Sequence, residues 1–376
     1  MADLGVGIIG CGNISKSYLK LGRLFKNLEI RAVADISFEA AKARAEEFGV
    51  DARTVADLLA SDDIDIVVNL TIPDAHFSVT KSILEAGKHA FSEKPLVLTL
   101  AEGERLRALA AEKNLRVGSA PDTILGGAHQ LARKRIDEGL VGKIIAGTCH
   151  VMSHGMEAWH PNPDFFFLPG AGPVLDIGPY YIANLINLIG PIRRVAALTS
   201  AGSETRTIGS GEREGQTVPV KTPTNIHALL EFENGATITL SASWDVWKHR
   251  HANMELYGED GTIFVPDPNF FGGKVEYAAR DGDIKEVEGW AHPLAVPNEA
   301  HGNGMMANYR TAGLADMAAA IVEGRDHRCS LDRALHAVDA MTAIIKSGET
   351  GSFITLTTTC ERPAPLGPDE AQALLK

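Results

Sequence analysis

The sequence is poor in cysteine. Its four cysteines, Cys11, Cys149, Cys329 and Cys360, lie far apart and form no C-x-x-C pair. Zinc sites and small disulfide-stabilised folds need closely or regularly spaced cysteines. The spacing therefore argues against both and favours a reducing compartment. We expect no metal ion in the functional site.

Basic charge and long apolar runs are also scarce. The 36 Lys and Arg are outnumbered by 48 Asp and Glu, which gives a formal net charge of −12. Proteins that bind nucleic acid or anionic membranes meet phosphate with Lys and Arg, so the composition argues against both partners. No apolar run is long enough to span a membrane, and the chain begins directly with a predicted strand rather than a signal peptide. We therefore expect a cytoplasmic protein.

The chain of 376 residues is long enough for two domains, and the order of its predicted strands and helices changes near residue 122. Residues 1–122 alternate strands and helices, which predicts a doubly wound parallel sheet. From residue 123 strands dominate, so residues 123–376 are expected to form an α+β domain with a large, mostly antiparallel open sheet. Within it, residues 200–222 are rich in Ser, Thr, Gly and charge and are predicted to form an exposed loop. The fold class is therefore α/β.

The most informative local motif is the first turn of the chain. An apolar strand over residues 6–9 is followed by Gly10 and Gly12. The first glycine permits a sharp turn, and the second lets the backbone approach a pyrophosphate at the N-terminus of the next helix. The second strand ends at Asp35, where a carboxylate that binds ribose is expected. Ser15 replaces the third glycine of the motif, and a plain strand–helix turn is the alternative interpretation.

The ligand of such a sheet binds beyond the carboxyl ends of its strands. Asp35 would accept hydrogen bonds from a free ribose hydroxyl and repel a 2′-phosphate, and Ile36 and Ser37 supply no cation. NAD is therefore favoured, although Lys42 or Arg44 on the following helix keeps NADP open. The predicted cofactor-binding residues are Gly10, Gly12, Asn13, Ile14, Asp35, Ser37, Thr71, Ile72, Pro73, His76, Glu93 and Lys94.

Two further motifs carry residues for chemistry. Glu93-Lys94-Pro95 follows a predicted strand at the same edge, where Lys94 can hydrogen-bond a substrate oxygen. Partial burial and a positive nicotinamide should both disfavour its ammonium form. Asp176 and Tyr180 follow a Gly-rich loop, and their spacing of four places them on one helix face. The alternatives are an exposed lysine in a proline turn and a helix cap beside a packed tyrosine.

Taken together, the Gly10 and Gly12 turn, Glu93-Lys94-Pro95 and Asp176-x-Gly178-x-Tyr180 resemble the Gfo/Idh/MocA oxidoreductase family, the relatives of glucose–fructose oxidoreductase and inositol dehydrogenase. The resemblance covers nearly the whole chain. It implies a Rossmann domain, a second domain whose open sheet is often used for oligomerisation, and NAD or NADP as cofactor. It also implies oxidation or reduction of a sugar, polyol or related carbonyl.

The resemblance further implies roles for individual residues. Lys94 would be the catalytic lysine, and Asp176 would bind or polarise the reacting hydroxyl. Many members carry His where Tyr180 stands, and Tyr is similar to the glucose–fructose oxidoreductase and dihydrodiol dehydrogenase branches. A tyrosine can exchange a proton when a nearby cation lowers its pKa. The predicted catalytic residues are thus Lys94, Asp176 and Tyr180, with the acid/base being Tyr180, Lys94 or the pair.

Residues 152–167 precede this motif and mix aromatic with polar side chains. Sugar sites commonly combine such groups, although a packed connecting loop is the alternative. The predicted substrate-binding residues are Lys94, His154, Trp159, His160, Asp164, Phe166, Asp176 and Tyr180. Second-tier candidates are His249, His251, His301, Asn303, Tyr309 and Arg310. The two histidines of the loop lack the carboxylate spacing of a metal site.

The sequence therefore predicts an NAD(P)-dependent dehydrogenase or reductase of a sugar, polyol or glycoside. We expect a homodimer or homotetramer formed through the second sheet. Two alternatives stay open. One is an enzyme that retains NAD and uses transient oxidation for elimination or epimerisation. The other is a dinucleotide-binding sensor without catalysis.

Overall fold

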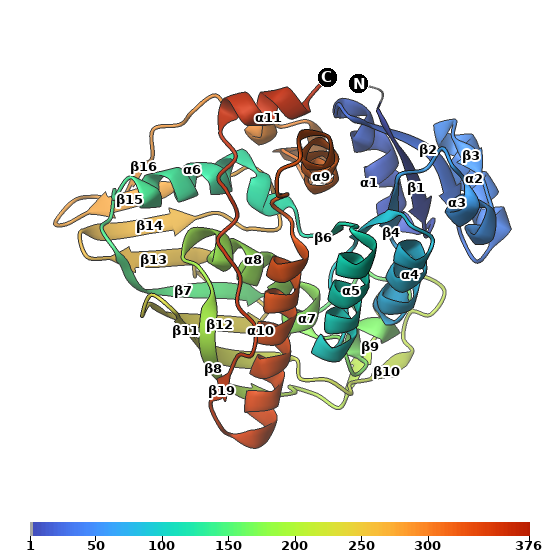
Figure 1. Cartoon of the computed structure of the whole chain (residues 1–376). Coiled ribbons are helices and arrows are strands. Elements are labelled where there is room, and N and C mark those ends of the chain that lie inside the picture. The colour runs from blue at the N-terminus through green and yellow to red at the C-terminus, as the bar shows by residue number, and fades with distance from the viewer. Residues whose placement is uncertain (1–2) are drawn as a thin grey trace.

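The computed structural model describes residues 3–376 and contains two large sheets with helices packed against them (Figure 1). The first sheet is parallel, and its strand order is β3-β2-β1-β4-β5-β6. Its strands are β1 (Leu4–Ile9), β2 (Leu28–Ala34), β3 (Asp51–Ala52), β4 (Ile66–Asn69), β5 (His89–Ser92) and β6 (Val117–Ser119). The predicted doubly wound sheet is confirmed. The strand order reverses between β1 and β4, which is where such folds bind ligands.

The helices of this domain follow the predicted alternation. They are α1 (Asn13–Leu21), α2 (Phe38–Phe48), α3 (Val55–Ala60), α4 (Pro73–Glu85) and α5 (Leu100–Lys113). Local capping explains several boundaries. The Ser37 side chain accepts a hydrogen bond from Ala40 N at the start of α2, and Gly49 ends that helix in the left-handed conformation. Thr99 forms a capping box with Glu102 at the start of α5.

The second sheet has nine strands in the order β16-β15-β14-β13-β7-β12-β11-β8-β19. They are β7 (Ile144–Met152), β8 (Ile192–Ser200), β11 (Asn225–Phe232), β12 (Thr237–Ser243), β13 (Met254–Gly258), β14 (Gly261–Val265), β15 (Glu276–Ala279), β16 (Lys285–Glu286) and β19 (Ile354–Thr355). All its neighbouring strands are antiparallel except β7 and β12, which are parallel. The prediction of a mostly antiparallel sheet is confirmed.

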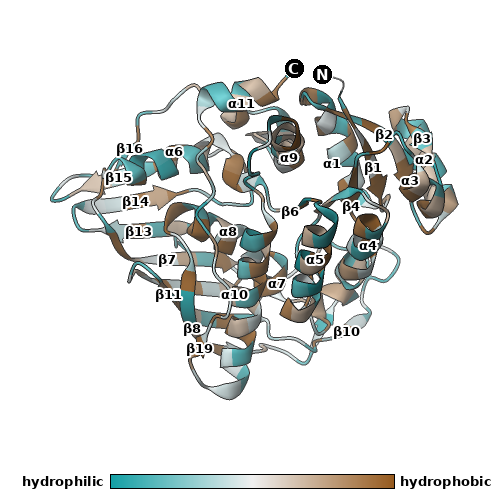
Figure 2. Ribbon diagram, in the orientation of Figure 1, coloured by the Kyte–Doolittle hydropathy of each residue, from teal (hydrophilic) through white to brown (hydrophobic). Residues whose placement is uncertain are grey.

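Helices cover one face of this sheet. They include α6 (Gly127–Asp137), α7 (Pro173–Asp176), α8 (Gly178–Leu188) and α10 (Leu331–Thr350). Every residue of α8 is buried, and the helix packs against α10 (Figure 2). On the other face Leu198, Leu229 and Phe353 are large exposed hydrophobic residues. Within the described residues, no helix covers this face of the sheet, which carries an apolar patch, as expected for an open sheet.

Residues 200–222 differ from the predicted exposed loop. They contain the hairpin of β9 (Thr205–Thr207) and β10 (Thr217–Pro219). Ile208 and Val218 join Phe167 and Trp244 in a small separate core. Most positions of the segment are exposed, as predicted, but the prediction of a loop without strands is wrong because two buried apolar side chains anchor a short hairpin.

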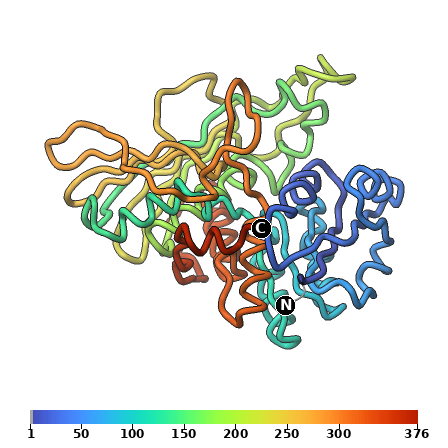
Figure 3. The backbone as a smooth tube through the Cα atoms, turned by 90° about the horizontal axis from the view of Figure 1, so that it is seen from above, coloured from blue at the N-terminus to red at the C-terminus, as the bar shows by residue number. Residues whose placement is uncertain are grey.

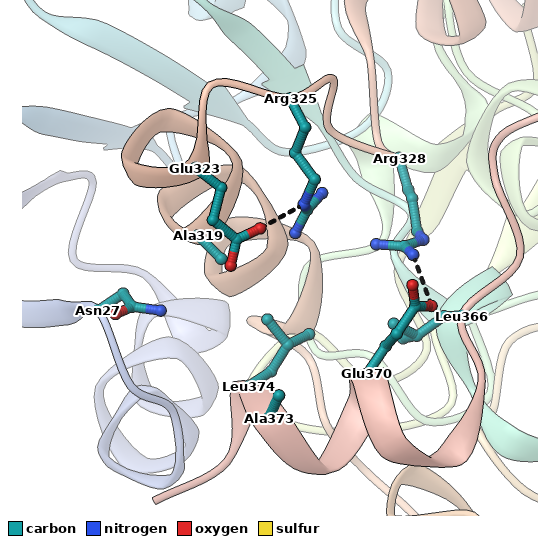
Figure 4. A pocket seen from close by; sticks show the side chains of 9 residues that line it. All are labelled: Asn27, Ala319, Glu323, Arg325, Arg328, Leu366, Glu370, Ala373 and Leu374. Atoms are coloured by element: carbon teal, nitrogen blue, oxygen red, sulfur yellow. Dashed lines mark hydrogen bonds and ion pairs between the residues drawn. The ribbon is translucent and has the colours of Figure 1, made fainter.

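The end of the chain returns to the first domain. Helices α9 (Ala312–Glu323) and α11 (Pro368–Leu374) share a hydrophobic cluster with β1, β2 and β4, and the C-terminus lies between the two halves (Figure 3). A small cavity lies at this seam (Figure 4), where Arg325 pairs with Glu323 and Arg328 with Glu370. The domain boundary at residue 122 stays a prediction.

The remaining elements are short. They are η1 (Gly22–Leu24), η2 (Thr123–Leu125), η3 (Asp164–Phe167), η4 (Pro293–Ala295), β17 (Glu299–His301) and β18 (Gly304–Met306). Across residues 3–376, no helix combines the length and the apolarity that crossing a membrane requires.

Candidate active site

The glycine turn after β1 has the geometry of a phosphate cradle. Gly10 has a φ of +106°, and a Cβ there would lie 2.6 Å from the backbone of Leu70, so only glycine fits without strain. At Gly12 an added Cβ would meet no atom within 4 Å. This glycine faces open space at the start of α1, whose first turn has no side-chain cap. The free N–H groups of the helix are therefore available to an anion.

Asp35 and Ser15 hold this turn in place. The Asp35 carboxylate accepts hydrogen bonds from Cys11 N at 2.8 Å and from Ser37 N at 2.9 Å. Ser15 is fully buried, and its hydroxyl donates to Gly12 O at 2.6 Å. The departure from the third glycine is thus accommodated by a small side chain that bonds back to the turn. These residues fit a dinucleotide, and contact of Asp35 with a ribose stays a prediction.

A cation also lies beside the turn. Arg44 Nη2 donates to Cys11 O at 3.0 Å and to Gly12 O at 3.4 Å, while Nη1 pairs with Glu47 at 2.5 Å. Lys42 instead pairs with Glu39 at 2.9 Å on the surface of α2. Of the two cations considered from the sequence, only Arg44 touches the glycine turn.

The loops after β4 and β5 are tied together by buried polar groups. Asn69 accepts a hydrogen bond from the Thr71 hydroxyl at 2.7 Å and donates to Thr80. The two ring nitrogens of His76 lie 2.6 Å from Pro95 O and 3.0 Å from Thr71 O. His76 is almost completely buried, so it braces these loops, and direct contact with a cofactor stays a prediction.

Lys94 and Asp176 join the two domains at the carboxyl end of β5. Lys94 Nζ donates to Asp176 O at 2.6 Å and to Asp176 Oδ1 at 2.9 Å. The side chains are 16% and 22% exposed, so a ligand can reach the pair. Burial lowers the pKa of Lys94, but the charges of Asp176 and Tyr180 outweigh it and hold the pKa above its usual value. Burial thus acts in the expected direction, but the Asp176 carboxylate favours the ammonium form; the effect of a positive nicotinamide stays a prediction.

Tyr180 completes this group, although not on the predicted helix. Lys94 Nζ lies 5.5 Å from the centroid of the Tyr180 ring. Asp176 ends α7 and Tyr180 lies in α8, with Ile177 between the two helices. The single-helix prediction is wrong because Pro179 has no N–H to continue a helix and instead occupies the first turn of a new one. Lys94 nevertheless brings Asp176 and Tyr180 together.

The sequence reasoning missed part of the support around these residues. Tyr18 is buried and donates to Glu93 Oε1 at 3.0 Å, and burial followed by the charge of Glu93 raises the pKa of Tyr18. The Asp122 carboxylate accepts hydrogen bonds from Thr311 N at 2.9 Å and Gly313 N at 3.0 Å. No sequence signal links Asp122 to residues so far along the chain.

The aromatic segment before α7, residues 152–167, is held by contacts between rings and by an ion pair. His154 lies against Trp247, with ring centroids 3.3 Å apart, and His160 lies between Trp159 and Phe166. Asp164 pairs with Arg213 at 2.5 Å. Within residues 3–376, no three His, Cys, Asp or Glu side chains gather as metal ligands would.

The predicted substrate contacts in this segment differ in exposure. Trp159 is 61% exposed, whereas Phe166 is half-buried. Phe166 O accepts a hydrogen bond from Gly172 N at 3.1 Å, and Gly172 O accepts one from Asp176 N at 3.0 Å. The segment thus connects directly to the Asp176 loop. Contact of His154, Trp159, His160, Asp164 and Phe166 with a substrate stays a prediction.

The fold and the glycine turn are those of a dinucleotide-binding protein. Residues 4–120 match the family model of the Gfo/Idh/MocA oxidoreductases, NAD-binding Rossmann fold, and residues 129–264 match the C-terminal domain model of the same family. The chain belongs to the Gfo/Idh/MocA family, as its motifs indicated.

Curated relatives and solved structures agree with this assignment. A levoglucosan dehydrogenase of Pseudarthrobacter phenanthrenivorans is 28% identical over 70% of this chain and 73% of its own length. A 1,5-anhydro-D-fructose reductase of Ensifer adhaerens is 24% identical over 68% of this chain and 74% of its own length. A levoglucosan dehydrogenase in complex with NADH and L-sorbose has a TM-score of 0.79 at 23% identity, covering 95% of this chain and 100% of that chain.

Proposed function

We propose that this protein transfers a hydride between NAD and a hydroxyl or carbonyl carbon of a sugar-like substrate. One observation carries the proposal: Lys94, Asp176 and Tyr180 meet at the carboxyl end of β5, the same sheet edge as the glycine turn. The named relatives that act on sugars support the substrate class. When bound, the nicotinamide supplies the hydride chemistry.

The residues of the site divide the remaining work. Gly10, Gly12 and the N-terminus of α1 bind the pyrophosphate, and Asp35 binds the adenosine ribose. Lys94 stays an ammonium because Asp176 pairs with it, so it donates a hydrogen bond to the substrate oxygen. Tyr180 then exchanges the proton with that oxygen, and Asp176 orients the hydroxyl. This arrangement favours Tyr180 over Lys94 as the acid/base.

The uncovered face of the second sheet supports association through this surface. Leu198 is 77% exposed, and Leu229 and Phe353 lie close to it around a shallow groove. An apolar patch of this kind marks a protein interface. We propose a homodimer or homotetramer formed by this face in the cytoplasm, and light scattering of Leu198→Lys against the unchanged protein tests the oligomer.

The experiment for the activity follows absorbance of reduced nicotinamide. The protein is mixed with NAD, and separately with NADP, and with sugars, polyols and glycosides, with Lys94→Met in parallel. Formation of NADH that depends on substrate and disappears in the variant supports the proposal. Conversion of a sugar without net NADH and with slow cofactor release would instead identify an enzyme that retains NAD. Tight NAD binding without any turnover would identify a sensor.

A further inference from the structure

Arg310 is a cation at the site without an anionic partner. It lies just before α9, next to Tyr180, and most of its side chain is buried. Lys94 pairs with Asp176 at 2.9 Å, whereas no carboxylate of residues 3–376 lies within the 4.0 Å limit of an ion pair with Arg310. A buried charge is normally paired, because removing it from water costs free energy. The missing partner therefore calls for an explanation.

Neutral oxygens hold the guanidinium in a fixed orientation. Nη2 donates to Asn269 O at 3.0 Å and to Asn269 Oδ1 at 2.8 Å, and Nη1 donates to Asn308 Oδ1 at 3.3 Å. A guanidinium has five N–H donors, so these contacts leave donors for a further acceptor. They orient Arg310 without neutralising it.

The backbone beside Arg310 is strained and locked. Thr311 has a φ of +113°, a conformation that a β-branched residue rarely adopts. Asp122 holds it there by accepting hydrogen bonds from Thr311 N and Gly313 N. Such strain persists only where the surroundings enforce it, and it is concentrated at functional sites. The chain thus holds Arg310 beside Tyr180.

The carboxylates around Arg310 are weak counter-charges. Burial lowers the pKa of Arg310, but Tyr180, Asp122 and Glu93 outweigh it and keep the side chain a cation. Burial raises the pKa of Asp122 and of Asp267, although the hydrogen bonds from Thr311 N and Gly313 N favour the carboxylate form of Asp122. Neither carboxylate lies within ion-pair distance of Arg310 in the described part of the chain. The positive charge of Arg310 is therefore only partly balanced before a ligand arrives.

We propose that the substrate supplies the missing charge and is a polyhydroxy acid, such as an aldonic or uronic acid. Its carboxylate binds Arg310, while a neighbouring hydroxyl lies between Lys94, Asp176 and Tyr180. The inference rests on the proposed function, because it narrows the substrate class of the same site. Arg310 then determines specificity, and Lys94 and Tyr180 carry the proton chemistry.

The test measures binding, so it does not depend on turnover. The protein is saturated with NADH, and D-gluconate and D-glucitol are titrated while NADH fluorescence is followed; D-glucuronate and D-glucose form a second pair. Each pair compares an acid with a neutral sugar or polyol of the same carbon number. We expect the acid of at least one pair to bind about tenfold more tightly or better, and Arg310→Gln to remove this preference.

Two variants serve as controls. Arg310→Lys keeps the charge without the fork geometry and should retain part of the preference. Arg280→Gln removes a guanidinium that is paired with Asp260, and it should leave the preference unchanged. Melting temperatures show whether each variant is folded, and the NAD affinity of Arg310→Gln should stay that of the unchanged protein.

Several results would overturn the proposal. They are equal binding of acid and neutral compound, no binding of either acid, and an acid preference that survives in Arg310→Gln. Weaker NAD binding in Arg310→Gln would place a cofactor phosphate at Arg310 instead. A protein that binds acids through Arg310 but never forms NADH would refute the proposed dehydrogenase and leave the acid site standing, so the two failures are distinguishable.

Discussion

The cofactor side and the substrate side of this site are built in different ways. Gly10, Asp35, Thr71 and Lys94 follow four adjacent strands of one sheet, so a single parallel sheet places them. On the substrate side, Lys94 meets Asp176, which is 82 residues away, and Asp122 holds Thr311, which is 189 residues away. One side needs only its own domain, and the other needs the two domains packed together.

Because of this difference, cofactor binding and proton transfer depend on largely different sets of residues. Substitutions on the cofactor side should change cofactor affinity or selectivity while the proton-transfer groups stay in place. Substitutions on the substrate side should change turnover or acid preference while NAD still binds. Lys94 belongs to both sides, because it follows β5 of the first sheet and bonds to Asp176 of the second domain. The predictions below test this separation.

The largest effect is expected at Lys94. Lys94→Met should lower turnover by about 10³-fold or more, because the substrate oxygen loses its charged donor and Tyr180 loses the adjacent cation. Lys88 lies just before the same strand and donates to Ser61 O and Ile64 O, both at 2.8 Å. Lys88→Met is therefore the matched control and should keep its turnover. NADH formation under saturating NAD measures both, and similar losses in the two variants would contradict the assignment.

The two glycines of the turn should respond differently to the same change. Gly12→Val should fold normally, since a side chain there meets open space, but it should weaken NAD binding by about tenfold or more by filling the pyrophosphate position. Gly10→Val should destabilise the fold by about 2–4 kcal/mol, because of the positive φ and the clash with Leu70. Calorimetric titration with NAD and denaturant unfolding measure the two effects. Unchanged NAD affinity in Gly12→Val would place the pyrophosphate elsewhere.

These predictions also show what the sequence could and could not supply. The doubly wound parallel sheet and the glycine turn followed from local motifs and strand ends, and the grouping of Lys94, Asp176 and Tyr180 followed from those motifs and the family resemblance. The break between Asp176 and Tyr180 was hidden because spacing alone does not show where a proline starts a new helix. The role of Asp122 was hidden because its partners lie near residue 311, and a contact between distant residues leaves no periodic pattern.

A smaller effect is expected for cofactor selectivity. Asp35→Asn removes the negative charge that opposes a 2′-phosphate, and its single amide oxygen keeps one of the two hydrogen bonds from Cys11 N and Ser37 N. The ratio of NAD to NADP affinity should fall by about tenfold, with Arg44 beside the turn available to the added phosphate. Competitive binding of NAD and NADP measures the ratio. A ratio that does not change would mean that Asp35 only shapes the turn.

The smallest effect expected is a pH dependence of the unfolding free energy, caused by the buried residue His129. His129 is buried, its Nε2 lies 2.8 Å from Phe270 O, and its Nδ1 lies 3.1 Å from the side-chain nitrogen of Asn184. This pairing requires the neutral ring, and burial lowers the pKa of His129 from 6.5 to about 4. The unfolded chain therefore binds a proton first as the pH falls, so stability that is present above pH 6.5 is lost between pH 6.5 and 4.

The expected loss is about 2 kcal/mol of unfolding free energy between pH 7 and 5, from a linkage of 1.36 kcal/mol per pKa unit. His129→Gln offers a donor and an acceptor but does not titrate, so its unfolding free energy should fall less over this range. Urea unfolding at the two pH values measures the unfolding free energy of both proteins. An equal fall in this free energy in the two proteins would contradict the assignment. Because the ring of native His129 stays neutral down to about pH 4, binding of acid through Arg310 and binding of NAD by the native protein should both stay unchanged between pH 7 and 5. Weaker acid binding over this range with unchanged NAD binding would mean that a group other than His129 titrates on the substrate side.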